Sequence, residues 1–328
     1  MTSRRLTATA CLTAVVGLMA ACSSGTQATS ASGPPATASS TSAPSRASSA
    51  PAAVLTPVLR VRAGGKPCGV LVAGRYVWVS VSAENAVRAV DRAKGTALPL
   101  ITVGSQPCGM ALGGGSVWVE NFGTNDVSRL DARTGRVQAT VAVGASPFDV
   151  TYAAGAAWVT DNLDGTVSRI DARTSRRTVV PVGGAPVGIV YAAGGLWVGT
   201  GSQVVRVDAR RAVVTDRLTT GAGAGWTAAS GDHVWIMNGQ DGTVSDIDAV
   251  HRRIVRTFAV GPTPLDGDVA NGVLWVPLKD GRLVQVDAAN DAVTRTWSTG
   301  VGVPFVVDAD GSEVWTADFR GTDLVRLR

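Results

Sequence analysis

Histidine, aromatic residues and long apolar runs are scarce in this chain of 328 residues. It has two histidines, and only 5% of its residues are aromatic, whereas 39 are glycine. Many glycines with few aromatics indicate tight turns rather than long helices. Beyond residue 22, no segment approaches the roughly 18 consecutive apolar residues that a membrane-spanning helix needs. Because 45% of the residues are hydrophobic, the chain can still bury a sizeable core, and an all-β fold is favoured.

Excess charge is also absent from most of the chain. The formal net charge is +5, but Arg4, Arg5 and Arg46 precede residue 54 and no acidic residue does, which leaves +2 for the remainder. A nearly neutral domain gives no electrostatic reason to bind nucleic acid. We therefore expect no nucleic-acid partner.

The N-terminus has the pattern of a secretion signal, with Arg4 and Arg5 before an apolar segment from Leu12 to Met19. The run from Leu18 to Gly25 resembles the lipobox of bacterial lipoproteins, with Met19 where that family usually has leucine. The resemblance implies that residues 1–21 are removed and that Cys22 is lipidated. The alternative is an ordinary signal cleaved near an incidental cysteine. Lipidation predicts an extracytoplasmic protein that its N-terminal lipid anchors to the cell membrane.

Residues 22–53 consist almost entirely of Ser, Thr, Ala, Pro and Gly. Such a segment cannot bury enough apolar surface to offset its ordering entropy. We expect a disordered tether, and a glycosylated stalk is compatible with the same composition.

A repeat of about 40 residues organises the chain after residue 54. Tryptophans in short Val-Trp-Val type strands recur at intervals of 38 to 40 residues: Trp78, Trp118, Trp158, Trp197, Trp235, Trp275 and Trp315. A proline lies eleven residues before each tryptophan, except where Ala224 replaces it. An aspartate that opens a turn follows each of the first six tryptophans. A period near 40 with four alternating strands is typical of a β-propeller.

Seven repeats predict a seven-bladed β-propeller over residues 54–328, built of four-stranded antiparallel blades. The last repeat stops after its third strand, whereas Val58 to Val61 form a lone strand before the first repeat. We expect residues 54 to 63 to pair with the last blade and to close the ring.

The repeated pattern is Pro-x-Gly-Val/Ile, then Val-Trp-Val, then Val-x-Arg-Ile-Asp-x-x-Thr-Gly-x-Val. It resembles the YVTN and virginiamycin B lyase type of seven-bladed propeller. Because these residues pack blades and form turns, the resemblance specifies architecture better than function. It also implies an alternative activity, since that lyase uses histidine, glutamate and a divalent metal at the channel mouth.

Neither histidine of this chain is placed for that chemistry. His233 lies within a predicted strand, and His251 lies in the turn after Asp248, which is usually the face opposite a propeller's mouth. No zinc-binding spacing, nucleophile elbow or phosphate-binding glycine loop is present. Catalytic residues are therefore not predicted, and no metal ligands are assigned.

Candidate ligand-binding residues are those that depart from the repeat at the predicted mouth. After the proline position, Asp149, Trp226 and Asp266 are not required by blade packing. The alternatives are that the two acids accept backbone N–H groups and that Trp226 fills the space left by the missing proline.

The loops predicted after the tryptophan strands add further candidates, with solvated loop charge as the alternative for Asp161, Asp318 and Arg320. These candidates are Glu120, Asn121, Asp161, Asn238, Asp318, Phe319 and Arg320. Acids mixed with amides and aromatics suit a small polar ligand, a cation or a basic peptide.

Two cysteines remain after the signal region. Cys68 and Cys108 occupy the same position in adjacent repeats, where neighbouring inner strands bring their Cα atoms within the roughly 4.4–6.8 Å that a disulfide needs. An exported chain meets an oxidising environment, so we predict a disulfide. A reduced pair of small apolar residues and a soft-metal pair are the alternatives.

The sequence therefore favours a noncatalytic, envelope-anchored β-propeller that binds a small polar ligand or a partner protein or peptide at its channel mouth. A metal-dependent lyase is the alternative, and a purely structural spacer is a third possibility that no sequence feature excludes. We expect a monomer without a cofactor, and a bound divalent cation is the alternative.

Overall fold

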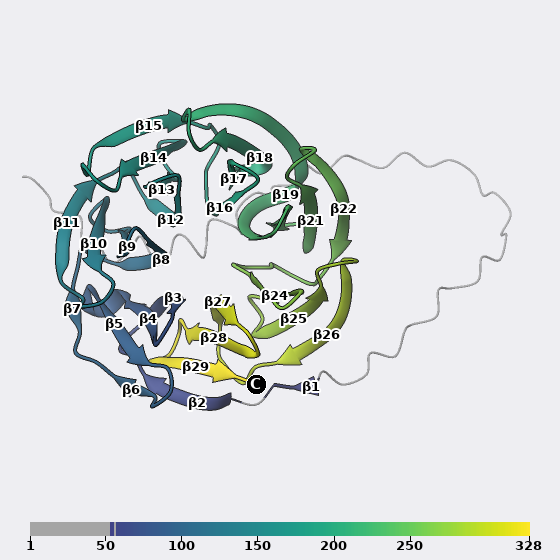
Figure 1. Cartoon of the computed structure of the whole chain (residues 1–328). Helices are drawn as coiled ribbons and strands as arrows, with labels where there is room; N and C mark the ends of the chain where they lie inside the picture. The colour runs from purple at the N-terminus through teal and green to yellow at the C-terminus, as the bar shows by residue number, and fades with distance from the viewer. Residues whose placement is uncertain (1–52, 56) are drawn as a thin grey trace, which may run out of the picture. The chain divides into compact units, whose positions relative to one another are not determined.

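The computed structural model describes residues 53–55 and 57–328. The predicted signal, Cys22 and nearly all of the predicted tether lie outside these residues. The described part is all-β, apart from one short 3-10 helix, η3 (Ser82–Glu84), and its sheets are arranged around a common centre (Figure 1). None of its helices is long and apolar enough to cross a bilayer.

Four of the sheets contain one repeat each, and in each of them consecutive strands pair antiparallel from the centre outward. The first sheet is β3 (Pro67–Ala73), β4 (Tyr76–Val81), β5 (Ala86–Asp91), β6 (Thr96–Ala97) and β7 (Ile101–Thr102). The second is β8 (Pro107–Gly113), β9 (Ser116–Asn121), β10 (Asp126–Asp131) and β11 (Val137–Ala142). The third is β12 (Pro147–Ala153), β13 (Ala156–Asp161), β14 (Thr166–Asp171) and β15 (Arg177–Pro181). A later one, which β1 (Ala53–Val54) joins in parallel, is β23 (Asp268–Ala270), β24 (Val273–Pro277), β25 (Arg282–Asp287) and β26 (Ala292–Ser298).

Two repeats share one seven-stranded sheet, which the sequence does not predict. Its strands are β16 (Ile189–Ala192), β17 (Gly195–Gly199), β18 (Gly201–Asp208), β19 (Val213–Ser230), β20 (His233–Asn238), β21 (Thr243–Asp248) and β22 (Arg253–Ala259). Strand β19 is the outer strand of one repeat and curves inward to become the inner strand of the next (Figure 1). Ala224 stands in place of the repeat proline and pairs with both Gly201 and Asn238. Without proline no corner breaks the strand.

The last sheet takes its outer strand from the N-terminal end of the described chain. Its strands are β27 (Pro304–Asp310), β28 (Glu313–Asp318), β29 (Asp323–Leu327) and β2 (Pro57–Arg62). Strand β2 pairs antiparallel with β29, with Val61 opposite Leu324. The predicted pairing of residues 54 to 63 with the last repeat is present over β2, whereas Val54 pairs with Ser298 of the preceding sheet.

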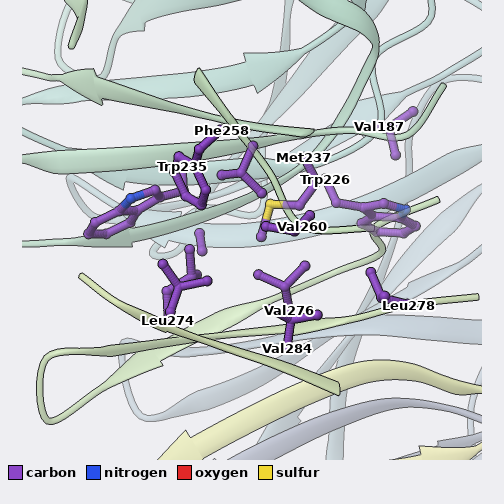
Figure 2. Packing of buried hydrophobic residues seen from close by; sticks show 13 residues of the cluster. Val187, Trp226, Trp235, Met237, Phe258, Val260, Leu274, Val276, Leu278 and Val284 are labelled. Carbon is purple, nitrogen blue, oxygen red and sulfur yellow. The ribbon is translucent and has the colours of Figure 1, made fainter. Parts of the chain in front are cut away.

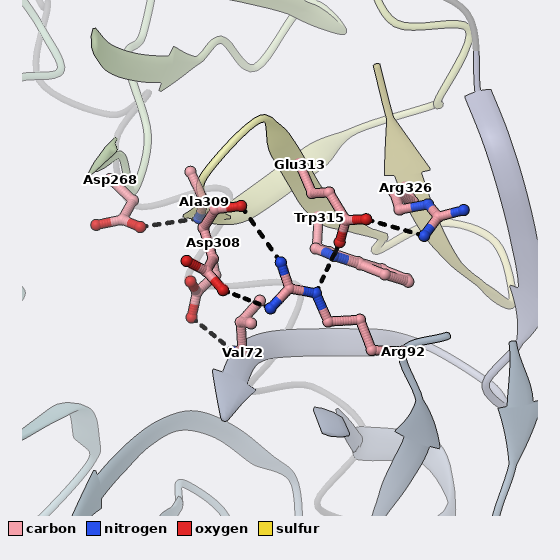
Figure 3. Close-up of polar contacts among 9 residues, drawn as sticks. Val72, Arg92, Asp268, Asp308, Ala309, Glu313, Trp315 and Arg326 are labelled. Carbon is pink, nitrogen blue, oxygen red and sulfur yellow. Dashed lines mark hydrogen bonds and ion pairs between the residues drawn. The ribbon is translucent and has the colours of Figure 1, made fainter. Parts of the chain in front are cut away.

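The first and last sheets also share a hydrophobic cluster and a polar network. The cluster includes Val61, Val70 and Trp315. In the network, the Arg92 guanidinium donates to Glu313 Oε2 at 2.7 Å and contacts Asp310 (Figure 3). The two sheets therefore pack face to face.

The tryptophan column supplies the packing between sheets. Six of the seven repeat tryptophans are at most 3% exposed, and Trp275 is half-buried. Where the next strand carries the arginine of the repeat, its guanidinium lies over the indole, as with Arg129 at 5.0 Å from the Trp118 ring centre. Figure 2 shows one such core, in which Trp235, Met237 and Phe258 pack on Leu274 and Val276 of the neighbouring repeat.

The cysteine prediction is confirmed. Cys68 in β3 and Cys108 in β8 form a disulfide, with their Cα atoms 5.0 Å apart. The bond ties the inner strands of the first two sheets.

Deleting residues 57–62 tests the contribution of β2. The deletion exposes the edge of β29 and removes from the shared cluster the buried Val61, worth about 1.5–3 kcal/mol, and the partly buried Leu59. We expect a large fall in Tm by thermal denaturation. Val58→Thr is the matched control, because Val58 is 47% exposed and its change should leave Tm within a degree or two. An unchanged Tm in the deletion would contradict a structural role for β2.

Candidate functional site

The pairing of the inner strands is irregular at an equivalent position in several repeats. Two of the candidate residues lie at this position. The pairing register shifts between Pro147 and Val150, and again between Ala224 and Thr227. The two residues after the proline position therefore leave the regular ladder, as in a β-bulge, and bulges redirect side chains next to functional sites. Asp149 and Trp226 occupy these positions. We call this end of the sheets the mouth.

Aromatic side chains from four repeats meet at the mouth, and we call them the aromatic cluster. The ring centres of Phe122 and Phe148 are 5.9 Å apart, and Phe148 lies 5.8 Å from Trp226. Trp226 contacts Phe305 at 5.4 Å, and Phe305 contacts Phe319 at 5.3 Å. Trp226 is only 7% exposed, whereas the four phenylalanines are half-buried. The cluster contains four of the chain's five phenylalanines.

Asp149 links two neighbouring inner strands. Its Oδ1 accepts the N–H of Val150 at 2.8 Å, and its Oδ2 accepts the N–H of Ile189, in the next repeat, at 2.9 Å. The alternative that this acid receives backbone N–H groups is thus confirmed. Desolvation nevertheless raises the pKa of Asp149 to about 7, although both hydrogen bonds lower it.

Two further inner-strand acids were not predicted from the sequence. Asp268 Oδ2 accepts the N–H of Ala309, and Asp308 Oδ2 accepts the N–H of Val72, each at 2.9 Å (Figure 3). Each carboxylate therefore bonds to the next repeat, as Asp149 does. Desolvation, followed by the charge of Asp268, raises the pKa of Asp308 to about 8.

Asp266 is the acid that these contacts leave without a donor. It forms a single β-bridge with Val306, and it receives no hydrogen bond from residues 53–55 or 57–328. Desolvation and the charges of Asp149, Asp268 and Asp308 all raise its pKa well above the usual range. Asp266 is also partly accessible to solvent, so it is the acid best placed to meet a ligand.

Glu120 occupies a repeat position that hydroxyl residues, Ser80 and Thr160, fill in the two adjacent repeats. Ser80 Oγ accepts the N–H of Gly69 at 2.7 Å and donates to the carbonyl of Cys108 in the next repeat. Glu120 Oε1 likewise accepts the N–H of Gly109 at 2.8 Å. The side chain is 1% exposed, its Oε2 has no partner among the described residues, and desolvation raises its pKa strongly. Glu120 therefore bonds within its own repeat, and the described residues contain no hydrogen bond from its side chain to the next repeat.

Asn121, Asp161 and Asn238 end strands β9, β13 and β20 rather than lying in the following loops, and all three are fully buried. Their partners lie in their own repeats, as when Asp161 Oδ2 accepts the hydroxyls of Thr166 and Ser168. The idea that Asp161 is a solvated loop charge is therefore wrong.

The last three candidates are consecutive residues at the end of β28, namely Asp318, Phe319 and Arg320. Asp318 ends the strand and has a buried Oδ1 without a partner among the described residues. Phe319 belongs to the aromatic cluster, and Arg320 is exposed. The structure thus brings Asp149, Trp226, Asp266 and Phe319 together at the mouth. The fully buried strand-end residues Asn121, Asp161 and Asn238 instead form hydrogen bonds within their own repeats.

The histidines lie away from the mouth. His233 begins β20, whereas Asn238 ends the same strand at the mouth. His233 contacts Asp246 at 2.9 Å, and His251 contacts Asp248 at 2.7 Å. Residues 53–55 and 57–328 contain no group of three or more His, Cys, Asp or Glu side chains arranged to hold a metal ion.

The raised pKa values predict that stability falls as pH rises. Folding lifts the pKa of Asp149 and Asp308 from 3.8 to about 7 and about 8. The folded state therefore binds more protons than the unfolded state between about pH 4 and pH 8, so the free energy of unfolding decreases with rising pH in that window.

Urea unfolding from pH 5 to pH 9 should show this decrease, at up to roughly 1.4 kcal/mol per pH unit for each such group. Asp308→Asn retains an acceptor for Val72 and should flatten the slope. The exposed Asp232 provides the control, and Asp232→Asn should preserve the wild-type slope. Equal slopes in both variants would contradict the pKa assignment.

Comparisons with known proteins bear on the fold. No protein-family model and no curated protein matches the chain. Among solved structures, a chain of Kuenenia stuttgartiensis hydrazine synthase matches with a TM-score of 0.71 and 14% sequence identity, over 80% of this chain and 95% of that chain. That protein contains a β-propeller. A likeness at this identity concerns architecture alone, and with the four-stranded antiparallel sheets it identifies a β-propeller-like fold.

Proposed function

We propose that residues 54–328 form a seven-bladed β-propeller of the YVTN and virginiamycin B lyase type, closed by β2 as the outer strand of the last blade. Seven tryptophan-bearing strands support seven blades, with the fused sheet counted as two. The cluster that Val61 and Val70 share with Trp315 supports closure, because it buries the faces of the first and last sheets against each other.

The function that this geometry supports best is noncatalytic binding at the mouth. The observation that carries the proposal is the aromatic cluster. Four of five phenylalanines gather there and remain half-buried, although the repeat does not require an aromatic residue at these positions. Partly exposed aromatics beside a few convergent polar groups are typical of ligand sites.

The ligand would be a small polar molecule, or a segment of a partner protein, that bears a cationic group. Asp149 and Phe148 are neighbours in the same bulge, and Asp266 lies opposite Val306, next to Phe305. A cation near Asp266 would relieve the repulsion that raises the pKa of this acid. Aromatic faces also attract cations.

An envelope location is part of the proposal. It is supported by the lipobox-like sequence that ends at Cys22 and by the Cys68 to Cys108 disulfide, which is typical of exported proteins. The lipid on Cys22 would hold the propeller at the membrane surface through the tether.

The proposal is tested by capturing ligands from native envelope extract with the full chain. Asp149→Asn/Asp266→Asn removes the acids at nearly constant shape, and Phe319→Ala removes part of the aromatic cluster. We expect both variants to lose most of the bound ligand. The control Asp232→Asn/Val250→Ala changes an exposed acid and an exposed aliphatic away from the mouth and should retain it.

Equal capture by all variants would contradict binding at the mouth. Elemental analysis of the same preparation addresses the lyase alternative. A tightly held, stoichiometric divalent metal would favour that alternative over noncatalytic binding.

A further inference from the structure

Exposed arginines gather at the end of the sheets opposite the mouth. They lie in the turns that follow β10, β14 and β18, in three consecutive repeats, and we call them the arginine arc. Its members are Arg133, Arg136, Arg173, Arg176, Arg210 and Arg211, all exposed. The third strands run from the mouth to these turns, since Asp126 pairs with Asn121 at the mouth and Asp131 pairs with Ser116 at the other end.

The turn aspartates do not form ion pairs with the arc. Asp131 Oδ1 accepts the N–H groups of Arg133 and Thr134 at 3.1 and 2.8 Å and also the Thr134 hydroxyl. These contacts hold the pKa of Asp131 below its usual value. Asp171 and Asp208 accept the equivalent backbone groups. In the described part of the chain, no carboxylate oxygen lies within 4.0 Å of an arc guanidinium nitrogen.

The corresponding turns of other repeats show that the fold does not require this charge. Arg92 in the first repeat is paired with Asp310 and Glu313. Arg252 in the fifth repeat pairs with Asp216, and the turn after Asp287 carries Ala289 and Asn290 instead of arginine. Among the described turns that follow third strands, arginines without an ion pair thus occur only in the second, third and fourth repeats.

The arc also contains a hollow suited to an anion. Its volume is about 620 Å³. Its lining is Arg129, Asp131, Arg133, Thr134, Arg136 and Gln138. The lining contains three guanidinium groups and one carboxylate, so the hollow carries a net positive charge. Guanidinium forks match phosphate oxygens.

We propose that the arginine arc docks on the phosphate headgroups of an anionic lipid bilayer. Equivalent turns of adjacent repeats lie at one level, so the arc presents its charges to a flat surface rather than to a groove. Basic residues near an anionic leaflet favour such docking. The inference rests on the proposed envelope location. It adds an orientation to that proposal. With the arc on the membrane, the mouth faces away from the bilayer and toward ligands in the surrounding medium.

The test uses the full chain carrying Cys22→Ser, so that no attached lipid can account for binding. Flotation with vesicles of phosphatidylcholine containing phosphatidylglycerol should recover the protein, and vesicles of phosphatidylcholine alone should not. Arg133→Gln/Arg173→Gln/Arg210→Gln should lower partitioning roughly 100-fold, at about tenfold or less per basic residue, and raised salt should weaken the wild type. The control Arg62→Gln/Lys66→Gln/Arg256→Gln removes the same charge from exposed positions outside the arc and should float like the wild type.

Equal flotation of the two triple variants would overturn the proposal, as would equal binding to both kinds of vesicle. Binding of inorganic phosphate by the wild type but not by the arc variant, without flotation on the phosphatidylglycerol vesicles, would show that the arc takes free phosphate and would overturn membrane docking. If the Cys22→Ser protein with an intact arc fails to float while lipidated wild type still fractionates with membranes, the docking surface is refuted and the Cys22 anchor stands alone. If Cys22 proves unmodified and flotation persists, the docking surface stands without the anchor.

Discussion

The structure depends on the packing of tryptophan-bearing sheets against one another. A four-stranded sheet of this size cannot bury its apolar faces alone, so each repeat needs neighbours on both sides. The indoles of Trp118, Trp158 and Trp197 are fully buried. Arginines of the adjoining strand lie over them at 5.0 to 5.9 Å, which explains why arginine recurs in the repeat. The same need for neighbours accounts for β2, which completes the last sheet.

This packing also determines the chemistry at the inner strands. Where the strands converge, water has little access, so carboxyl groups there are costly to ionise. Asp149, Asp268 and Asp308 offset part of this cost by accepting N–H groups of the next repeat. Asp266 has no such donor in the described residues. Three of the acids thus join neighbouring repeats, and Asp266 is the carboxyl that we propose meets a ligand.

Much of the architecture follows from sequence periodicity, because one packing problem is solved repeatedly with the same residues. The period placed Trp118 in a second strand, Cys68 beside Cys108, and β2 against β29. The fused sheet was not predicted because it results from one substitution. Ala224 replaces the repeat proline, so no corner separates the outer strand of one repeat from the inner strand of the next. For the site, Asp149 and Trp226 stood out as departures from the repeat. Asp268 and Asp308 were missed although each lies two residues beyond the proposed mouth position and so shares its strand face.

The most direct test is amide hydrogen exchange across the last sheet, because the proposed closure of the propeller rests on β2. Pairing predicts that Leu59 and Val61 in β2, together with their partners in β29, are protected to a degree close to that of internal strands such as β13 and β14. Rapid exchange in β2 and along the outer edge of β29, with internal strands protected, would show an open sheet edge and would contradict the proposed closure of the ring.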